Sequence, residues 1–352
     1  MRVLVIAVAL LGCKKSDEKP APKPAEQPAK PAEPPVAVKP VGACENLDLV
    51  LASKILGDAA HPCRARLDAV YGRMISTGLA FSGTLVSTKP KRGAGFFITC
   101  QHCTGADGDG LREPEKEEPS AFNGLAPAQL AGTAVRSGPE SRLYFIHRVF
   151  SRMPPKSAFD AKGRLTNIKP EDDFVVGTIS GEPVDVVGHI GVLPSAKVSD
   201  KRLTVHDPRE LLSQQPWAEA KPGTQALLLG FPRDMPAMTF GGELVASVGE
   251  ILDDTRAKEM LLRADADEAA IPYDPSVELV VAARASSGMS GGGAFDEDGR
   301  YLGVSVRGTL NPVDGKYLVR VVRAPYVMKQ LAAALAAAPA PLRTKLEPFL
   351  LP

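Results

Sequence analysis

The sequence has little of what would favour nucleic-acid binding or a repetitive architecture. Lysine plus arginine (42) nearly equals aspartate plus glutamate (41), so the chain lacks the basic excess typical of nucleic-acid-binding proteins, and it has no acidic tail. Aromatic residues make up only 5% of the 352 residues, and no internal repeat is found. The hydrophobic fraction of 44% nevertheless allows a sizeable core in one large or two small domains.

The sequence also lacks a hydrophobic run long enough to cross a membrane. Its apolar stretch over residues 3–11 is too short to span a bilayer, and it follows Arg2, as in a secretory signal. The stretch ends in Leu-Leu-Gly-Cys at residues 10–13, which resembles the bacterial lipoprotein box. The resemblance implies a signal peptide over 1–12 and lipidation of Cys13. An ordinary signal peptide with a chance cysteine is the alternative.

A lipidated Cys13 would anchor an exported protein to a membrane without spanning it. The next residue is Lys14 rather than aspartate, which favours the outer membrane of a bacterial cell envelope, with the protein facing the periplasm or the cell surface. Residues 13–42 are rich in Pro, Ala and Lys and cannot bury a core, so we expect an extended tether there. A proline-rich ligand for a partner module is the alternative.

Cysteine is scarce, with five residues in the chain. Four follow the tether, and they are Cys44, Cys63, Cys100 and Cys103. In an exported chain they can form disulfides, and four cysteines allow three connectivities. The pairs Cys44–Cys63 and Cys100–Cys103 are favoured. A redox or metal-binding role for the second pair, which lies in Cys-Gln-His-Cys, is the alternative; no second pair of ligands is nearby, so no metal site is expected.

The first folded segment is predicted to be a helical hairpin over residues 43–78. Apolar residues recur at helical spacing over 47–55, and Gly57 can end that helix. The same spacing returns over 67–74. This hairpin is expected to pack on the main domain.

From residue 80 onward, short β-type runs separated by Gly, Pro and Asp predict an all-β sandwich or barrel. Polar segments 104–142 and 150–172 are expected to be long surface loops, and a single helix over 325–337 is predicted before a tail over 339–352. The predicted strands cover residues 83–86, 95–99, 143–146, 173–179, 184–187, 225–230, 243–248, 278–282, 294–295, 301–306 and 318–322.

The stretch around Ser290 carries the strongest chemical signal. Ser290 follows Gly288-Met289 and precedes three consecutive glycines at 291–293. Glycine is unfavourable inside helices and strands, so this run indicates a tight turn from which the serine hydroxyl projects. A serine on such a turn, followed by a hairpin, is a candidate nucleophile; a plain Gly/Ser-rich loop is the alternative.

A serine nucleophile needs a base and a carboxylate that holds the base. His102 lies just past the strand predicted over 95–99, where it would be held rigidly and yet be reachable. Asp173 heads the strand predicted over 173–179, so its side chain can be buried and aimed. Asp172 is the alternative by one residue, and a solvated acidic turn is the alternative without a catalytic role.

The order His102, Asp173, Ser290 in these contexts resembles the trypsin/chymotrypsin superfamily of serine peptidases, especially its bacterial members. Five motifs carry the resemblance, and they are Ile-Thr-Cys-Gln-His-Cys at 98–103, Asp-Phe-Val-Val at 173–176, Gly-Thr-Gln-Ala-Leu-Leu-Leu-Gly-Phe-Pro at 223–232, Gly-Met-Ser-Gly-Gly at 288–292 and Val-Ser-Val-Arg-Gly at 304–308.

The resemblance implies an all-β fold of two six-stranded barrels, at about 79–198 and 199–323, within a peptidase domain over 79–338. The helical hairpin would precede the barrels and the C-terminal helix would follow them. The implied activity is that of a serine endopeptidase, which cleaves peptide bonds of a polypeptide substrate through an acyl-enzyme. No cofactor is expected, and the chain is expected to be a monomer.

The resemblance also implies the role of each site residue. His102 would take the proton of Ser290, Ser290 would attack the carbonyl carbon, and Asp173 would fix the tautomer of His102. The backbone N–H groups of Gly288 and Ser290 would form the oxyanion hole. The substrate pocket would include Arg284, Ser305, Val306 and Arg307.

Arg284 corresponds to the base of that pocket and Arg307 to its rim, so the pocket is expected to prefer acidic or polar side chains, because a buried arginine favours a carboxylate. An Arg284 that is neutralised by an internal acid or points outward is the alternative.

Three departures from the family pattern leave a second function open. Met289 stands where trypsin-like zymogens carry an aspartate, so activation by N-terminal cleavage is not expected. Cys103 has no cysteine partner in the strand before Gly93, and Gln101 is bulkier than the usual alanine. Either change could distort His102. The alternative is a catalytically impaired relative that binds peptides or proteins as an envelope lipoprotein.

Overall fold

The computed structural model describes residues 44–71, 74–77, 81–89, 94–103, 133–137, 140–151, 156–159, 168–185, 217–232, 244–337 and 340. The predicted signal peptide, the lipidation site Cys13 and the tether over 13–42 lie outside these residues, as does the predicted tail apart from Ala340. Within the described ranges, no helix combines the length and the apolar character needed to cross a membrane.

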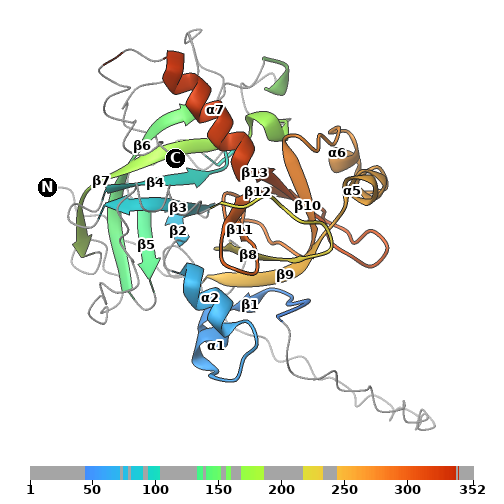
Figure 1. The fold of residues 1–352 in the computed structure, drawn as a ribbon, viewed down its shortest axis with the longest axis horizontal. Coiled ribbons are helices and arrows are strands. Elements are labelled where there is room, and N and C mark those ends of the chain that lie inside the picture. Colours follow the sequence, from blue (N-terminus) through green and yellow to red (C-terminus); the bar gives the residue numbers. More distant parts are fainter. Residues whose placement is uncertain are drawn as a thin grey trace, which may run out of the picture. The chain divides into compact units, whose positions relative to one another are not determined.

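Six antiparallel strands close into a barrel (Figure 1). Their order around the barrel is β2 (Met74–Thr77), β3 (Phe81–Lys89), β4 (Ala94–Thr99), β7 (Val175–Asp185), β6 (Glu140–Ser151) and β5 (Thr133–Ser137). Closure pairs the strands at both edges, which removes the open edges of a flat sheet. The barrel prediction for the first half of the folded chain is therefore confirmed.

Seven further strands form a second antiparallel sheet. Their order is β1 (Val50–Leu51), β9 (Val245–Ile251), β10 (Glu278–Ala282), β13 (Val319–Arg323), β12 (Tyr301–Gly308), β11 (Gly293–Phe295) and β8 (Gln225–Gly230). β8 also pairs with β9, with Leu228 opposite Ser247. The hydrogen-bonded neighbours thus run from β9 through β10, β13, β12, β11 and β8 back to β9.

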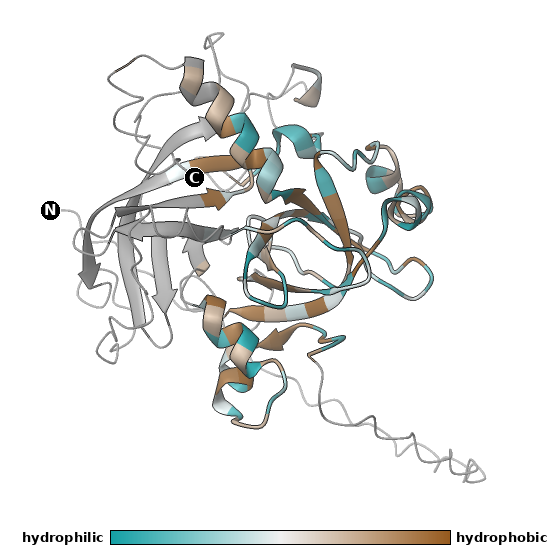
Figure 2. Ribbon diagram, in the orientation of Figure 1, coloured by the Kyte–Doolittle hydropathy of each residue, from teal (hydrophilic) through white to brown (hydrophobic). Residues whose placement is uncertain are grey.

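The strands of the second sheet are mostly hydrophobic and their connections more hydrophilic (Figure 2). Successive residues of β8 belong to different clusters: Leu227 and Leu229 pack in one, and Ala226 and Leu228 in another. Both faces of this strand are therefore buried, because neighbouring side chains of a strand point to opposite sides. This explains why β8 is a continuous apolar run rather than an alternating one.

Five described helices accompany the strands; the predicted closing helix over 325–337 is confirmed by the last of them, whereas the two helices between residues 254 and 269 were not predicted. The five helices are α1 (Ala52–Gly57), α2 (Arg64–Val70), α5 (Asp254–Leu261), α6 (Ala266–Ala269) and α7 (Ala324–Ala337). Helix α5 has an N-cap in the sequence next to it: the Asp253 side chain accepts a hydrogen bond from the backbone N–H of Arg256. The helix buries Ala257, Met260 and Leu261.

The predicted helical hairpin is shorter than expected at both ends. Val50 and Leu51 form a strand that pairs with β9, and Met74 begins β2, opposite Thr84. Sheet pairing at distant positions overrides the helical spacing of these apolar residues. The first barrel consequently begins at Met74 rather than near residue 79.

The expected loop over 104–142 also contains structure, since β5 and the start of β6 lie within it. The expected loop over 150–172 contains two short 3₁₀ helices, η2 (Lys156–Ala158) and η3 (Pro170–Asp172). In the closed barrel, β5 pairs with both β2 and β6. By contrast, β8 and β10 have the predicted bounds.

A buried ion pair links two strands of the second sheet. Arg320 on β13 binds the carboxylate of Glu278 on β10 through two hydrogen bonds, from Nε (2.8 Å) and Nη2 (2.6 Å), and both side chains are 1% exposed. Arg320 also donates to the carbonyls of Ile271 and Pro272. Burial alone lowers the pKa of Arg320, but the hydrogen bond and charge of Glu278 outweigh it, so the pKa is raised and the guanidinium stays charged.

We predict that Glu278→Gln lowers the free energy of unfolding by about 3 kcal/mol, because it leaves the buried charge of Arg320 without its main partner. Chemical denaturation measures this change. The matched control is Asp314→Asn, which removes the acid of the exposed Arg263–Asp314 pair (side chains 54% and 60% exposed) and should cost less than about 1 kcal/mol. Equal losses in the two variants would contradict the prediction.

Candidate active site

His102 and Asp173 are brought together by the pairing of β4 with β7. Thr99, the last residue of β4, lies opposite Val175, the first of β7, so the turn after one strand meets the segment before the other. The Nδ1 atom of His102 lies 2.7 Å from Oδ2 of Asp173, and the backbone N–H of His102 donates to Oδ1 at 3.0 Å. Asp173 is fully buried, whereas the His102 side chain is 30% exposed. A buried carboxylate thus orients an imidazole whose Nε2 faces away from it.

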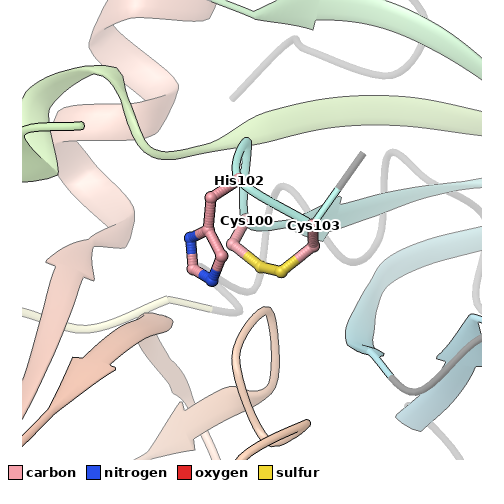
Figure 3. Close-up of side chains that lie close together, drawn as sticks. All are labelled: Cys100, His102 and Cys103. Atoms are coloured by element: carbon pink, nitrogen blue, oxygen red, sulfur yellow. A yellow bond between two sulfur atoms is a disulfide. The ribbon is translucent and has the colours of Figure 1, made fainter. Parts of the chain in front are cut away.

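The turn that carries His102 is closed by a disulfide. Cys100 and Cys103 are bonded, and their chain segment loops back with His102 between them (Figure 3). Both cysteines are buried. A ring nitrogen of His102 and the two sulfurs lie within 4.8 Å of one another, but disulfide sulfurs are not the thiolate ligands that a metal ion requires. The second disulfide joins Cys44 to Cys63, so both bonds are those favoured by the sequence.

Ser290 lies on a sharp turn formed by glycines in the left-handed region. Gly288 has a φ of +93° and Gly291 a φ of +83°, values that residues with a side chain rarely adopt. Inside the turn, the N–H of Met289 donates to the carbonyl of Ser286 at 3.0 Å. Met289 is 2% exposed, so the residue before Ser290 is packed in the interior. The Ser290 side chain is partly exposed.

The Ser290 turn packs directly against the end of β4. A Cβ atom at Gly291 would lie 3.1 Å from the backbone nitrogen of Cys100, two residues before His102. The backbone N–H of Ser82 on β3 donates to the carbonyl of Ser290 at 3.0 Å. The turn with the candidate nucleophile and the turn with the candidate base therefore lie side by side, although they are far apart in the sequence.

The hydrogen bonds of the Ser290 hydroxyl and of the backbone N–H groups on its turn describe the state of the candidate nucleophile. Its hydroxyl donates to the carbonyl of Val306 at 3.4 Å, and no hydrogen bond between described residues joins it to His102. Among the described hydrogen bonds, none uses the backbone N–H of Gly288 or of Ser290 as a donor.

Strand β12 lies beside the Ser290 turn, as the predicted pocket requires. The N–H of Gly291 donates to the carbonyl of Ser305 at 2.7 Å, and the N–H of Ser305 donates to the carbonyl of Gly292 at 2.8 Å. With the Ser290–Val306 contact, these bonds place Ser305 and Val306 next to the candidate nucleophile.

The two arginines of the predicted pocket do not provide a free buried cation, and this expectation is corrected. The Arg284 side chain is 47% exposed, pairs with Asp48 at 3.6 Å and lies over the ring of Tyr317. A side chain that is half exposed does not lie at the base of a buried pocket. Arg307 is 21% exposed, and its Nε lies 2.7 Å from Glu268, which neutralises it.

Sequence reasoning missed Ser82. It lies at the start of β3, is fully buried, and contacts the Ser290 turn through both its backbone and its hydroxyl. The sequence Phe-Ser-Gly-Thr around it contains no motif that marks such a role, because the role depends on contact with residues more than 200 positions away.

Comparison with known proteins finds similar solved structures only at low sequence identity. No protein-family model matches the chain, and no curated protein matches it. Solved structures that are similar include the Rv3671c protease from M. tuberculosis in its active form (15% identity, 86% of this chain and 93% of that chain, TM-score 0.37). A Glu endopeptidase in complex with MPD is 12% identical, with 84% of this chain and 99% of that chain covered and a TM-score of 0.39. The scabies mite inactivated protease paralogue S-D1 is 11% identical, with 83% and 97% covered and a TM-score of 0.46.

Proposed function

We propose that this chain is a serine endopeptidase that cleaves peptide bonds through an acyl-enzyme. One observation carries the proposal: a buried Asp173 holds Nδ1 of His102 at 2.7 Å, on a turn that packs against the glycine turn of Ser290. A carboxylate, an imidazole and a serine on a strained turn are the groups that nucleophilic acyl transfer requires. The order of these residues along the chain supports the same interpretation.

In the proposed reaction, the Ser290 hydroxyl leaves the Val306 carbonyl, donates to Nε2 of His102 and attacks the scissile carbonyl carbon. His102 takes the proton and later delivers it to the leaving amine, while Asp173 holds the ring and stabilises its protonated form. The backbone N–H groups of Gly288 and Ser290 donate hydrogen bonds to the developing oxyanion, a contribution worth about 10²–10³ in rate per donor in serine peptidases. Water then hydrolyses the acyl-enzyme at Ser290 and releases the product acid.

We propose further that the fold is of the trypsin type with two barrels. The continuous pairing from β9 round to β8 and back supports a second barrel beside the closed first one. The peptidase domain then spans about 74–338, with its first residue moved from 79 because β2 begins at Met74.

The proposed setting is the bacterial cell envelope, with the chain exported and anchored through a lipid on Cys13. Support comes from the sequence at residues 10–13 and from the two disulfides, since such bonds persist in oxidising compartments. The proposed substrate is a polypeptide, and the proposed enzyme is a monomer that needs no cofactor.

A second candidate function is binding of peptides or proteins without cleavage. It is favoured by the hydrogen bond of the Ser290 hydroxyl to Val306 instead of to His102. If substrate binding breaks the hydrogen bond between Ser290 and Val306, the hydroxyl can turn to His102 and catalysis can proceed. If the bond persists, the site binds peptides without cleaving them.

A fluorophosphonate probe separates the two candidates, because it reacts covalently only with an activated serine. The purified chain is treated with the probe, digested, and the modified residue located by mass spectrometry. Modification of Ser290 is expected and supports the peptidase. An unmodified chain, or a probe on another serine, would contradict it and favour the binding protein.

A further inference from the structure

Ser82 joins the first barrel to the Ser290 turn through its side chain. Its hydroxyl donates to the carbonyl of Gly288 at 2.8 Å and accepts from the backbone N–H of Phe231 at 2.7 Å. Ser82 is 0% exposed, so water cannot replace either bond. One hydroxyl therefore links β3, the segment after β8 and the turn of the nucleophile.

The backbone of Ser82 contacts the same turn from a second position. Its N–H donates to the carbonyl of Ser290 at 3.0 Å. Its own carbonyl accepts from the Thr99 hydroxyl at 2.7 Å, and a Cβ at Gly291 would collide with that carbonyl. Thr99 ends β4, which leads to His102. The backbone around Ser82 thus lies between the two turns of the candidate site.

These contacts hold two peptide units of the turn. The Ser82 hydroxyl holds the carbonyl of the Gly288–Met289 unit, and the N–H of that unit is held by Ser286. The Ser82 N–H holds the carbonyl of the Ser290–Gly291 unit. The N–H of Ser290 belongs to the unit between them. The carbonyl of that unit, Met289 C=O, accepts from the N–H of Gly292 at 2.9 Å, and because a peptide unit is planar this bond directs the Ser290 N–H to the opposite side.

We propose that Ser82 is a positioning residue: by holding the Gly288 carbonyl, it keeps the turn in the conformation in which the N–H groups of Gly288 and Ser290 can donate to the oxyanion. The inference rests on the proposed peptidase function. Preorganised donors stabilise a transition state only when they already point at the developing charge. Ser82 itself touches neither substrate nor reacting atoms.

Ser82→Ala removes the hydroxyl and frees the Gly288 carbonyl to rotate. The expected result is a decrease of about tenfold or more in the maximal rate of fluorophosphonate labelling, with the probe concentration at half-maximal rate unchanged. The pH dependence of labelling should keep its midpoint, because the contact between His102 and Asp173 is untouched. If the role of Ser82 were only structural, the unfolding temperature would fall, but the maximal labelling rate would not decrease selectively while the probe concentration at half-maximal rate stayed constant.

Ser247→Ala is the matched control. Ser247 on β9 is also 0% exposed, and its hydroxyl donates to the carbonyl of Leu47 at 3.2 Å, away from the Ser290 turn. The two variants lose the same group from a buried site, so a comparable decrease in thermal stability is expected in both. Only Ser82→Ala should slow labelling, measured well below both unfolding temperatures.

Hydrogen–deuterium exchange of the peptide that covers residues 286–292 provides a readout that needs no activity. Faster exchange in Ser82→Ala than in Ser247→Ala supports the proposal. Labelling of Ser82→Ala at the rate of the unmodified chain would overturn it and leave the peptidase function standing. If the unmodified chain is not labelled, the peptidase function fails and the catalytic role of Ser82 fails with it; exchange then shows whether Ser82 still holds the turn.

Discussion

Ser290→Ala is expected to lower the rate of peptide-bond hydrolysis by about 10⁶-fold, in practice to the detection limit, because no other group at the site can form the acyl-enzyme. The structure explains why no neighbour substitutes. Ser290 lies between Gly288 and Gly291, both with positive φ, and this backbone presents only its own hydroxyl beside β12 and the end of β4. Release of dye from fluorescein-labelled casein measures the rate.

Ser287→Ala is the control for the serine. Ser287 is exposed and three positions before Ser290 on the same loop, so its hydroxyl should be dispensable and the rate should stay within about twofold of the unmodified chain. Circular dichroism and thermal unfolding of both variants establish that each is folded. Retention of more than a hundredth of the activity in Ser290→Ala would show that another residue is the nucleophile.

Asp173→Asn is expected to lower kcat by about 10⁴-fold while the protein stays folded, as the same change does in well-studied serine peptidases. Asp173 accepts hydrogen bonds from the backbone N–H and from Nδ1 of His102, and it is fully buried. An amide at this position can present its NH₂ group to Nδ1, which favours the tautomer with the proton on Nε2. That tautomer cannot accept the proton of Ser290.

The control for the carboxylate is Asp172→Asn, one residue earlier. The sequence alone left Asp172 and Asp173 as alternatives, but the structure places only Asp173 within hydrogen-bond distance of His102 among the described contacts. Asp172→Asn should change kcat by less than about tenfold. Equal decreases of kcat in the two variants would show that the acidic pair affects activity by stabilising the fold. The midpoint of thermal unfolding would test this independently.

Much of the architecture was predictable because local patterns coincide with the tertiary result. The apolar run of β8 and the five-residue run of β10 have no competing interpretation, and their predicted bounds are those observed. The short strand β5 and the start of β6 were not predictable, because their polar sequences form strands only when the barrel closes around them. Helix α5 was predictable from Asp253 as N-cap and was overlooked.

For the candidate site too, local sequence patterns predict some features and distant contacts decide the others. Ser290 is marked by its own glycines and His102 by the strand before it, so residue type and local context were enough to propose them, whereas the strand after the acidic pair left Asp172 and Asp173 as alternatives. The position of Arg284 could not be predicted in the same way, because the direction of a side chain on a loop depends on partners such as Asp48 and Tyr317 that are distant in sequence.

The sequence by itself determined the all-β character, the four cysteines available for disulfides, and the candidates for the triad, which are Ser290, His102 and the acidic pair Asp172–Asp173, because each depends on patterns within about ten neighbouring positions. Only the tertiary structure decided which aspartate meets His102, where the arginines point, and that Ser82 holds the Ser290 turn. Those outcomes depend on the register of β4 with β7 and on packing between the two sheets. Strand register and side-chain packing are set by contacts between distant segments, which a linear pattern does not record.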